Sequence, residues 1–216
     1  MKIIKPYAEI IYPADNNDVI DIYRSIEYSG RKCYKSKMDE NDSELTKKFI
    51  RKLIKDGHEA MLEHSNMKVN FIVDRGISHE IVRHRIASFA QESTRYCNYS
   101  KDKFGNELTF IEPCFFEKDS PEYQLWESMC KSSEDAYLAL IEAGRTPQEA
   151  RCILPHSLKT ELVMTTNIRE WRHFFNLRAA GTTGKPHPQM VEVAVPLLKK
   201  CQKLMPELFD DIKIDV

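Results

Sequence analysis

Two short segments of alternating residues, set among longer segments of helical periodicity, restrict the fold of this chain most strongly. In Met67–Val73 the apolar side chains alternate with Lys68 and Asn70, which is the period-two pattern of a half-buried strand. Leu158–Met164 suggests a second strand in the same way. Because strands are few and do not alternate regularly with helices, we expect an α+β fold with a mixed or antiparallel sheet flanked by helices, rather than a doubly wound sheet.

Helices are predicted where apolar residues at helical spacing follow a capping residue and precede glycine or proline. The first runs from near Asn17 to Tyr28, with Ile20, Tyr23 and Ile26 facing inward, and should end at Gly30. The others run from Ser43 to Gly57, from Ser78 past Ile86, from Ser120 to Gly144, from Thr146 to Pro155, from Asn167 past Phe175, and from Met190 to Leu208. The last helix should be kinked or broken at Pro196, and Gly181–Pro188 should be a loop. Trp171, Phe174 and Phe175 are interpreted as core packing.

The length and uniform composition predict one domain, residues 1–216, because 216 residues suffice for a sizeable core and no repeat or linker interrupts them. Lys and Arg total 32 against 33 Asp and Glu, which gives no reason to expect nucleic acid or a membrane as a partner. Met1–Asn17 holds no membrane span and no signal-peptide pattern, and six scattered cysteines form no disulfide framework. These features predict a cytoplasmic protein.

One string of residues has the composition of an anion site. Arg83–Arg95 reads RHRIASFAQESTR and combines guanidinium groups with short hydroxyl side chains, both of which suit phosphate. An isolated RHR triplet is more often a solvated helix face, but the longer string favours a phosphate site. The chain contains neither GxxxxGK[ST] nor GxGxxG, so arginine must replace the usual glycine loops.

The RHR triplet also suggests an oligomer. If Arg83, His84 and Arg85 were helical, their side chains would spread over roughly 200° around the axis. One small ligand cannot easily contact all three, so the helix would lie between two ligands or two subunits. On this ground we expect a homo-oligomer with shared sites.

The string RHRIASFAQESTR resembles the signature of flavin-dependent thymidylate synthases, in which Ser, any residue and Arg follow an RHR triplet after seven residues. The segments GHEAMLEH (57–64), ARCILP (150–155) and TNIREWRHFFNLR (166–178) resemble other segments of the same family, in the same order. The resemblance thus extends over most of residues 57 to 178, and it implies the fold of thymidylate synthase complementing proteins.

The resemblance implies two sets of ligand-binding residues. The FAD set is His58, Ala60, Glu63, Arg83, His84, Arg85, Gln91, Asn167, Ile168, Arg169, His173 and His187. The dUMP set is Glu80, Ile81, Val82, Arg83, Gln91, Glu92, Ser93, Thr94, Arg95, Arg151 and Arg178.

The resemblance also implies the reaction. Such an enzyme transfers a one-carbon unit from methylenetetrahydrofolate to dUMP, with a hydride from NADPH or NADH relayed by FAD, and it is a homotetramer with shared active sites. Arg178 is implied as the catalytic residue that lies against the uracil and favours its ionised form. The family uses no cysteine nucleophile, because the flavin supplies the chemistry.

Four positions depart from the family pattern. Ala90 and Gln91 stand where many relatives have Asn and Glu, Ala60 replaces a common hydroxyl residue, and His173 replaces a frequent Asn. These departures affect single flavin and sugar contacts, and not the class of protein.

Parts of the sequence are also compatible with two alternatives. An RNA-binding module could use the arginines for phosphates and Tyr96 and Tyr99 for base stacking, but the net charge and the absence of an RNA-binding motif disfavour it. A zinc site could draw on the histidines and a cysteine, but their spacings match neither CxxC nor HExxH, so no metal is expected. That set is His58, His64, His79, His84 and Cys97.

Overall fold

The computed structural model describes residues 1–38 and 42–214, which form two compact units. Unit 1 consists of Met1–Tyr7, Phe71–Arg83 and Ala90–Leu162, and unit 2 of Ala8–Asn70, His84–Phe89 and Val163–Val216. Each unit combines three separate segments, so distant parts of the chain must come together to form either one. That residues 1–216 make one domain stays a prediction.

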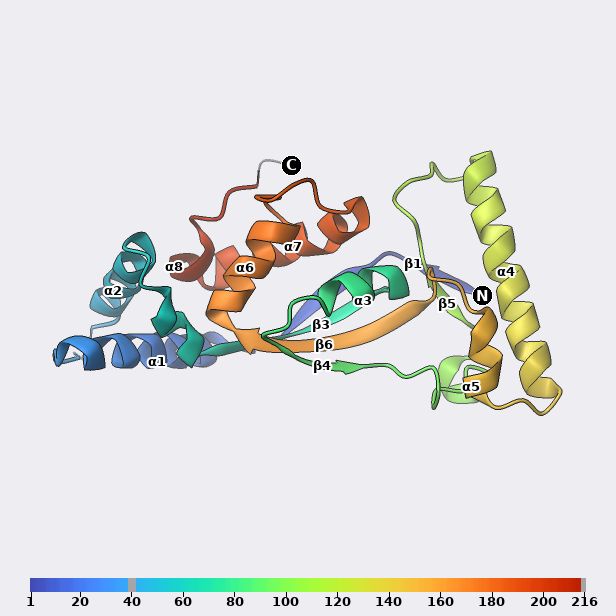
Figure 1. Ribbon diagram of the computed structural model, residues 1–216, viewed down its shortest axis with the longest axis horizontal. Helices are drawn as coiled ribbons and strands as arrows, with labels where there is room; N and C mark the ends of the chain where they lie inside the picture. The colour runs from blue at the N-terminus through green and yellow to red at the C-terminus, as the bar shows by residue number, and fades with distance from the viewer. Residues whose placement is uncertain (39–41, 215–216) are drawn as a thin grey trace. The chain divides into compact units, whose positions relative to one another are not determined.

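The strands of the described residues form two small sheets. They are β1 (Lys2–Ile4), β2 (Tyr7–Tyr12), β3 (Asn66–Asp74), β4 (Ser88–Gln91), β5 (Thr109–Ile111) and β6 (Lys159–Asn167). Strand β1 pairs in parallel with β5, and the other four form an antiparallel sheet in the order β2-β3-β6-β4. The two predicted strands, β3 and β6, are therefore neighbours in one sheet (Figure 1). The α+β class is confirmed.

Helices supply most of the remaining structure. The α-helices are α1 (Asn16–Tyr34), α2 (Ser43–Lys55), α3 (Arg75–Ile81), α4 (Pro121–Glu142), α5 (Pro147–Ala150), α6 (Ile168–Arg178), α7 (Pro188–Leu204) and α8 (Pro206–Phe209). Short 3-10 helices are η1 (Glu59–His64), η2 (Asp102–Phe104) and η3 (Arg151–Ile153).

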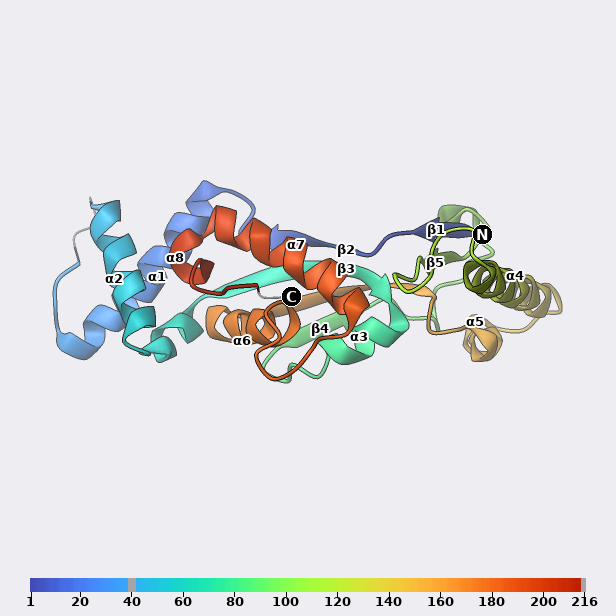
Figure 2. The ribbon, with the colours of Figure 1, turned by 90° about the horizontal axis from the view of Figure 1, so that it is seen from above.

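Unit 1 is built around a core beneath α4. Helix α4 packs against α5 and η3, and β1 lies beside β5 (Figure 2). The buried core residues all come from the segment Ala90–Leu162 and are Tyr99, Leu108, Phe110, Cys130, Tyr137, Ala150 and Leu158. Ser120 caps α4 by accepting the Tyr123 N–H at 3.2 Å, which confirms the predicted start of this helix.

Unit 2 has an aromatic core centred on α6, which packs against α7 and η1. The Trp171 ring contacts Phe174 and Phe175, and the Phe175 ring meets Phe209 edge to face with centroids 5.5 Å apart. The indole Nε1 of Trp171 donates to the Met67 carbonyl at 3.0 Å. These rings are fully buried, which confirms that the aromatic residues of α6 are core.

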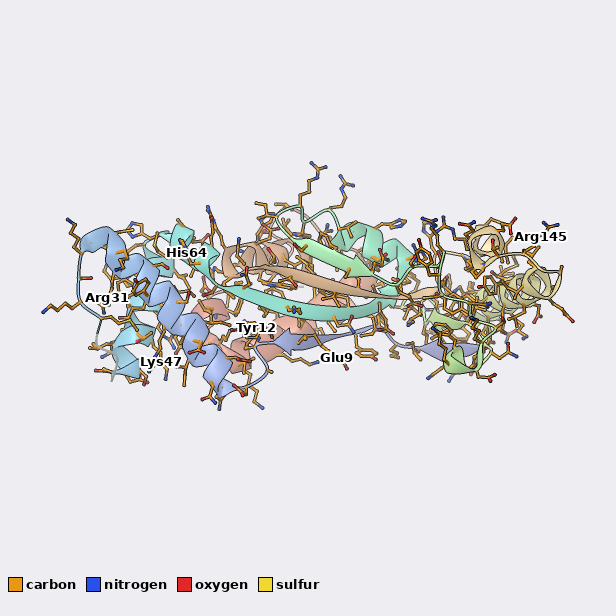
Figure 3. The ribbon with its side chains drawn as sticks, turned by 90° about the horizontal axis from the view of Figure 1, so that it is seen from below. Glu9, Tyr12, Arg31, Lys47, His64 and Arg145 are labelled. Carbon is orange, nitrogen blue, oxygen red and sulfur yellow. The ribbon has the colours of Figure 1, made fainter. Side chains whose placement is uncertain are left out.

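Helices α1 and α2 also lie in unit 2, where Arg31 marks the first and Lys47 the second (Figure 3). The predicted stop of α1 at Gly30 is wrong, because the helix continues to Tyr34. At Gly30 a Cβ atom would lie 2.7 Å from the Phe49 ring, so this glycine permits close approach of α2. Ile20 was expected inward but is 44% exposed.

The helix before the RHR triplet begins and ends earlier than predicted. Asp74 caps α3 by accepting the Ile77 N–H at 2.7 Å, so Ser78 lies inside the helix. Helix α3 ends at Ile81, and Arg83 follows in a turn. The triplet is therefore not helical, and the 200° argument for an oligomer fails.

The other predicted helices differ only in detail. Asp42, rather than Ser43, caps α2, and Gly57 follows it with a φ of 72°. Helix α7 continues through Pro196, so no break occurs there, and a kink at this residue stays a prediction; the helix ends at Leu204, before Pro206 begins α8.

Among the described residues, no helix has both the length and the apolar character needed to cross a membrane. Among the described residues, which include all six cysteines, no cysteine is joined in a disulfide, as expected.

Candidate functional site

A pocket of about 510 Å³ opens in unit 2 beside α6. Its lining mixes acids, cations and amides: Glu59, Glu63, Ile86, Asn167, Arg169, Glu170, Arg172, His173 and Asn176. Four of these belong to the set that the sequence predicts for FAD, namely Glu63, Asn167, Arg169 and His173. Asn167 is also the cap of α6, since its side chain accepts the Glu170 N–H at 2.9 Å.

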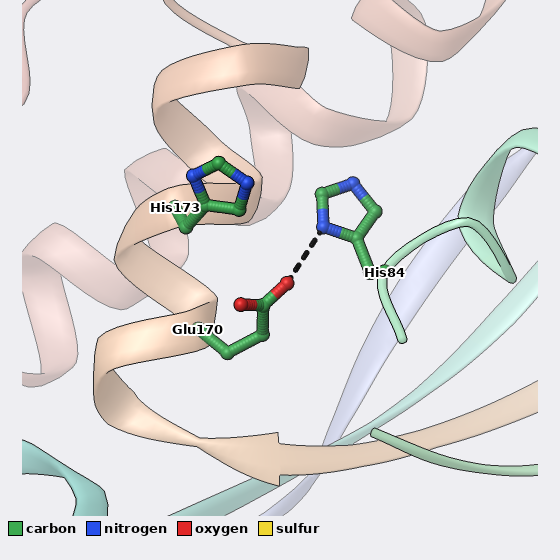
Figure 4. Close-up of side chains that lie close together, drawn as sticks. All are labelled: His84, Glu170 and His173. Atoms are coloured by element: carbon green, nitrogen blue, oxygen red, sulfur yellow. Dashed lines mark hydrogen bonds and ion pairs between the residues drawn. The ribbon is translucent and has the colours of Figure 1, made fainter. Parts of the chain in front are cut away.

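His84, from the RHR triplet, lies buried against α6 and is hydrogen bonded through both ring nitrogens. Its Nδ1 lies 2.9 Å from a Glu170 carboxylate oxygen (Figure 4), and its Nε2 accepts from the Arg178 Nε at 3.3 Å. A carboxylate can only accept, and the Arg178 Nε–H can only donate, so the neutral ring carries its proton on Nδ1. The structure thus brings together His84 and Arg178, two residues that the sequence predicts for the site.

The surroundings of His84 favour its neutral form. Burial lowers the pKa of the ring, and the nearby Arg178 and His173 lower it further, against the opposing effect of Glu170. Rings of Phe174 and His173 lie with centroids 5.0 Å and 5.7 Å from the His84 ring. At neutral pH, His84 therefore acts as a hydrogen-bond acceptor toward Arg178.

The arginines near the pocket differ in how firmly they are held. Arg172 is buried and donates to the Leu208 carbonyl and to both carboxylate oxygens of Asp211, at 2.8 and 2.6 Å. Arg169 is half exposed and pairs with Glu63 at 2.5 Å. Arg172 is thus a structural residue, whereas Arg169 can exchange its partner for a ligand.

The predicted dUMP residues lie mainly in unit 1, around a turn that follows β4. In this turn the Arg95 N–H faces the Ser93 Oγ at 3.3 Å, and Tyr96 and Cys97 donate to the Ser93 carbonyl. Arg151, from η3, donates to the buried Thr94 hydroxyl at 3.3 Å. The structure therefore gathers a guanidinium group and hydroxyl groups at this turn, as the sequence predicts for a phosphate site.

Gln91 has a fixed orientation in unit 1. Its Nε2 donates to the hydroxyls of Ser78 and Thr160 at 3.0 and 3.2 Å. The Ser78 hydroxyl already donates to the Arg75 carbonyl at 2.9 Å, so it must accept from Gln91. The side-chain carbonyl oxygen of Gln91, Oε1, can consequently accept a hydrogen bond from a ligand.

Glu92 is less suited to a ligand than the sequence suggests. Its carboxylate accepts from Tyr99 at 2.8 Å and pairs with Lys159 at 3.0 Å, in unit 1. Tyr99 is 5% exposed, which excludes it from the base stacking that the RNA-binding alternative requires.

The remaining predicted residues of unit 1 surround the end of α3. Glu80 is partly buried, Ile81 is fully buried in the core, and Val82 is the C-cap of the helix. Arg83 is exposed in the turn beyond it.

The other residues of the FAD set lie in unit 2 outside the lining of the pocket. Ile168 is fully buried at the start of α6, whereas Arg85, His58 and Ala60 are exposed. His187 is exposed and caps α7, with its Nδ1 accepting the Gln189 N–H at 3.3 Å. Ile168 and His187 thus have structural roles, and their contact with a cofactor stays a prediction.

Glu170 is the principal residue that sequence reasoning missed. It is 9% exposed and lines the pocket. At the third position of a helix an acid usually indicates capping, so no local pattern points to a partner 86 residues away.

Among the described residues, one group could hold a metal ion: His84, Glu170 and His173, with candidate ligand atoms within 4.8 Å of one another. Both His84 nitrogens are already hydrogen bonded, and the Arg178 guanidinium opposes a cation. The group therefore supports no metal site, and the expected absence of a metal stays a prediction.

Comparison with known proteins shows the family. The model of the family described as thymidylate synthase complementing protein matches residues 18–207. The chain belongs to this family. A flavin-dependent thymidylate synthase from Geobacter sulfurreducens is 31% identical over 87% of this chain and 80% of its own. Another from Corynebacterium glutamicum is 30% identical over 94% of this chain and 86% of its own.

A solved structure shares the fold of this family member. The UMP/dUMP methylase PolB from Streptomyces cacaoi, bound with 5-Br dUMP, matches 97% of this chain with a TM-score of 0.73. The match covers 96% of that protein at 22% sequence identity. The fold predicted from the resemblance is thereby confirmed.

Proposed function

We propose that the protein is a flavin-dependent thymidylate synthase. It transfers a one-carbon unit from methylenetetrahydrofolate to dUMP, with a hydride from NADPH or NADH passed on through FAD, and releases dTMP and tetrahydrofolate. The observation that carries this proposal is the contact between Arg178 and His84, which joins the predicted catalytic residue to the signature triplet of the family.

The size and chemistry of the pocket beside α6 support a small-molecule site there. Its volume of about 510 Å³ falls in the range of roughly 300–1,000 Å³ found for small-molecule sites. Asn167, Arg169 and His173 offer donors and acceptors that suit a heterocyclic ring with polar edges. These residues and Glu63 would hold the flavin, which supplies hydride transfer when bound.

The dUMP phosphate would be held by the turn after β4. Ser93, Thr94, Arg95 and Arg151 provide hydroxyl and guanidinium donors there. The Gln91 carbonyl would accept from a sugar hydroxyl, since its amide donors are engaged.

Arg178 would act on the uracil ring through its charge. A guanidinium group beside the imide stabilises the ionised form, in which the ring carbon is a stronger nucleophile. Because His84 is neutral, it orients Arg178 without adding a second positive charge. No cysteine is needed, and burial raises the pKa of the Cys97 thiol, which disfavours its reactive thiolate.

Assembly and location follow the family expectation. We propose a homotetramer with shared active sites, acting in the cytoplasm and using NADPH. The free cysteines suit a reducing compartment. The subunit count rests on the family alone, since the triplet is not helical.

The test is anaerobic reduction of the purified, FAD-loaded protein by NADPH, followed by methylenetetrahydrofolate and dUMP and assay of dTMP. We expect a yellow protein whose flavin absorbance changes with dUMP. Arg178→Ala should abolish most turnover, whereas Cys97→Ala should leave it nearly unchanged. A colourless protein that cannot bind FAD but retains RNA on a filter would instead support the RNA-binding alternative.

A further inference from the structure

We propose that Glu170 is a positioning residue that acts through His84 to hold the Arg178 guanidinium for the reaction. This inference rests on the proposed function, in which Arg178 is the catalytic residue. Glu170 belongs to neither predicted ligand set and to none of the roles assigned above.

Glu170 selects the tautomer of His84. A neutral histidine can carry its proton on either nitrogen, and burial of His84 removes water as an alternative partner. The Glu170 carboxylate, 2.9 Å from Nδ1, can accept a hydrogen bond but cannot donate one. It therefore selects the form in which Nε2 has a free lone pair.

The tautomer of His84 in turn orients the Arg178 guanidinium. The Arg178 Nε–H points at Nε2 of His84, 3.3 Å away. In the opposite tautomer two N–H groups would face each other, and Arg178 would have to turn away. A protonated ring would also repel the guanidinium, but burial and Arg178 itself keep the ring neutral.

Helix α6 holds Glu170 and Arg178 in a fixed arrangement. Glu170 is fixed by its place in the first turn of α6, where its own N–H donates to Asn167. Glu170 and Arg178 lie on the same helix, which spans Ile168–Arg178, and His84 is inserted between their side chains. The helix thus fixes the distance between Glu170, which selects the tautomer of His84, and Arg178, which donates a hydrogen bond to His84.

The experiment compares Glu170→Ala and Glu170→Gln with Arg178→Ala and the double variant Glu170→Ala/Arg178→Ala. We expect Glu170→Ala to lower kcat about 10-fold to 100-fold, which is the effect of losing a hydrogen bond to a charged group. Gln can still accept at Nδ1, so Glu170→Gln should lose less. In the double variant the loss should equal that of Arg178→Ala within about twofold, because Glu170 acts through Arg178.

A second readout does not depend on activity. In ¹⁵N-labelled protein the His84 ring should show a protonated Nδ1 and an unprotonated Nε2, and Glu170→Ala should shift this pattern toward the other tautomer. Glu44→Gln, an exposed acid on α2, is the matched control and should change neither readout.

The outcomes separate the two proposals. An unchanged tautomer in Glu170→Ala, or losses that multiply in the double variant, would overturn the role of Glu170. If the wild-type protein makes no dTMP although the tautomer depends on Glu170, the proposed function fails while the hydrogen-bonded chain stands.

Discussion

The hydrogen bond between Tyr23 and Glu207 offers a sharp test of the packing of unit 2. The Tyr23 hydroxyl donates to Glu207 at 2.6 Å, and both residues are less than a tenth exposed. Tyr23→Phe removes the donor and leaves the ring in place, so no cavity forms. Glu207 keeps Arg51 at 2.9 Å, but one carboxylate oxygen loses its buried partner.

We expect this variant to lose about 2 kcal/mol of unfolding free energy at pH 7, within the range of roughly 1.5–3 kcal/mol for hydrogen bonds to charged groups. In a chain of this length the loss corresponds to a Tm decrease of about 4–8 °C. Urea denaturation measures the free energy directly. Tyr28→Phe is the control, because Tyr28 lies on the same helix and is 57% exposed.

The same variant has a predicted pH dependence. Burial alone raises the pKa of Glu207, but the hydrogen bonds from Tyr23 and Arg51 outweigh it and hold the pKa below 4.5. A lowered pKa in the folded state stabilises above pH 4.5, and this stabilisation is lost as the pH falls. The difference between wild type and Tyr23→Phe should therefore be full at pH 7 and shrink below pH 4.5. Equal losses in Tyr23→Phe and Tyr28→Phe would refute the reasoning.

Two further substitutions test the elements that position the site. Asp74→Ala should cost about 1–2 kcal/mol by removing the cap of α3, whereas Asp74→Asn should cost only a few tenths; thermal unfolding distinguishes them, and equal losses would contradict the capping role. Asp211→Asn should cost about 1–2 kcal/mol at pH 7, a value reduced because the Asp211 side chain is 50% exposed. The pairing with Arg172 lowers the pKa of Asp211 below 3.8, so the loss should fade below that pH; a loss independent of pH would exclude the ion pair as its cause.

Local patterns were sufficient for most elements of the fold. Strands β3 and β6 and helices α4 and α6 follow directly from periodicity and capping residues. Where two capping residues stand close together, as Asp74 and Ser78 do, the pattern does not decide between them. In the structure the earlier residue, Asp74, caps α3, and the helix ends at Ile81, before the RHR triplet.

The site was predicted only as far as the family resemblance reached. It pointed to His84 and Arg178 as site residues, but it could not reveal the hydrogen bond between Glu170 and His84, because these residues are 86 positions apart in the sequence. For Ile81 and Ile168 the structure shows buried core side chains, and a ligand contact at these two positions stays a prediction.

The charges around the pocket limit which arginines can serve a ligand. A guanidinium group that is buried and makes four hydrogen bonds, such as that of Arg172, cannot leave its partners without exposing unpaired polar groups. Arg169 is half exposed, and its pairing with Glu63 contributes little in water, so an anionic or polar ligand can displace that carboxylate. Arg178 differs from both, since the group that accepts from its Nε–H, the His84 ring, is neutral. At this contact a neutral acceptor orients the Arg178 Nε–H without adding a negative charge beside the guanidinium, which a carboxylate in the same position would do.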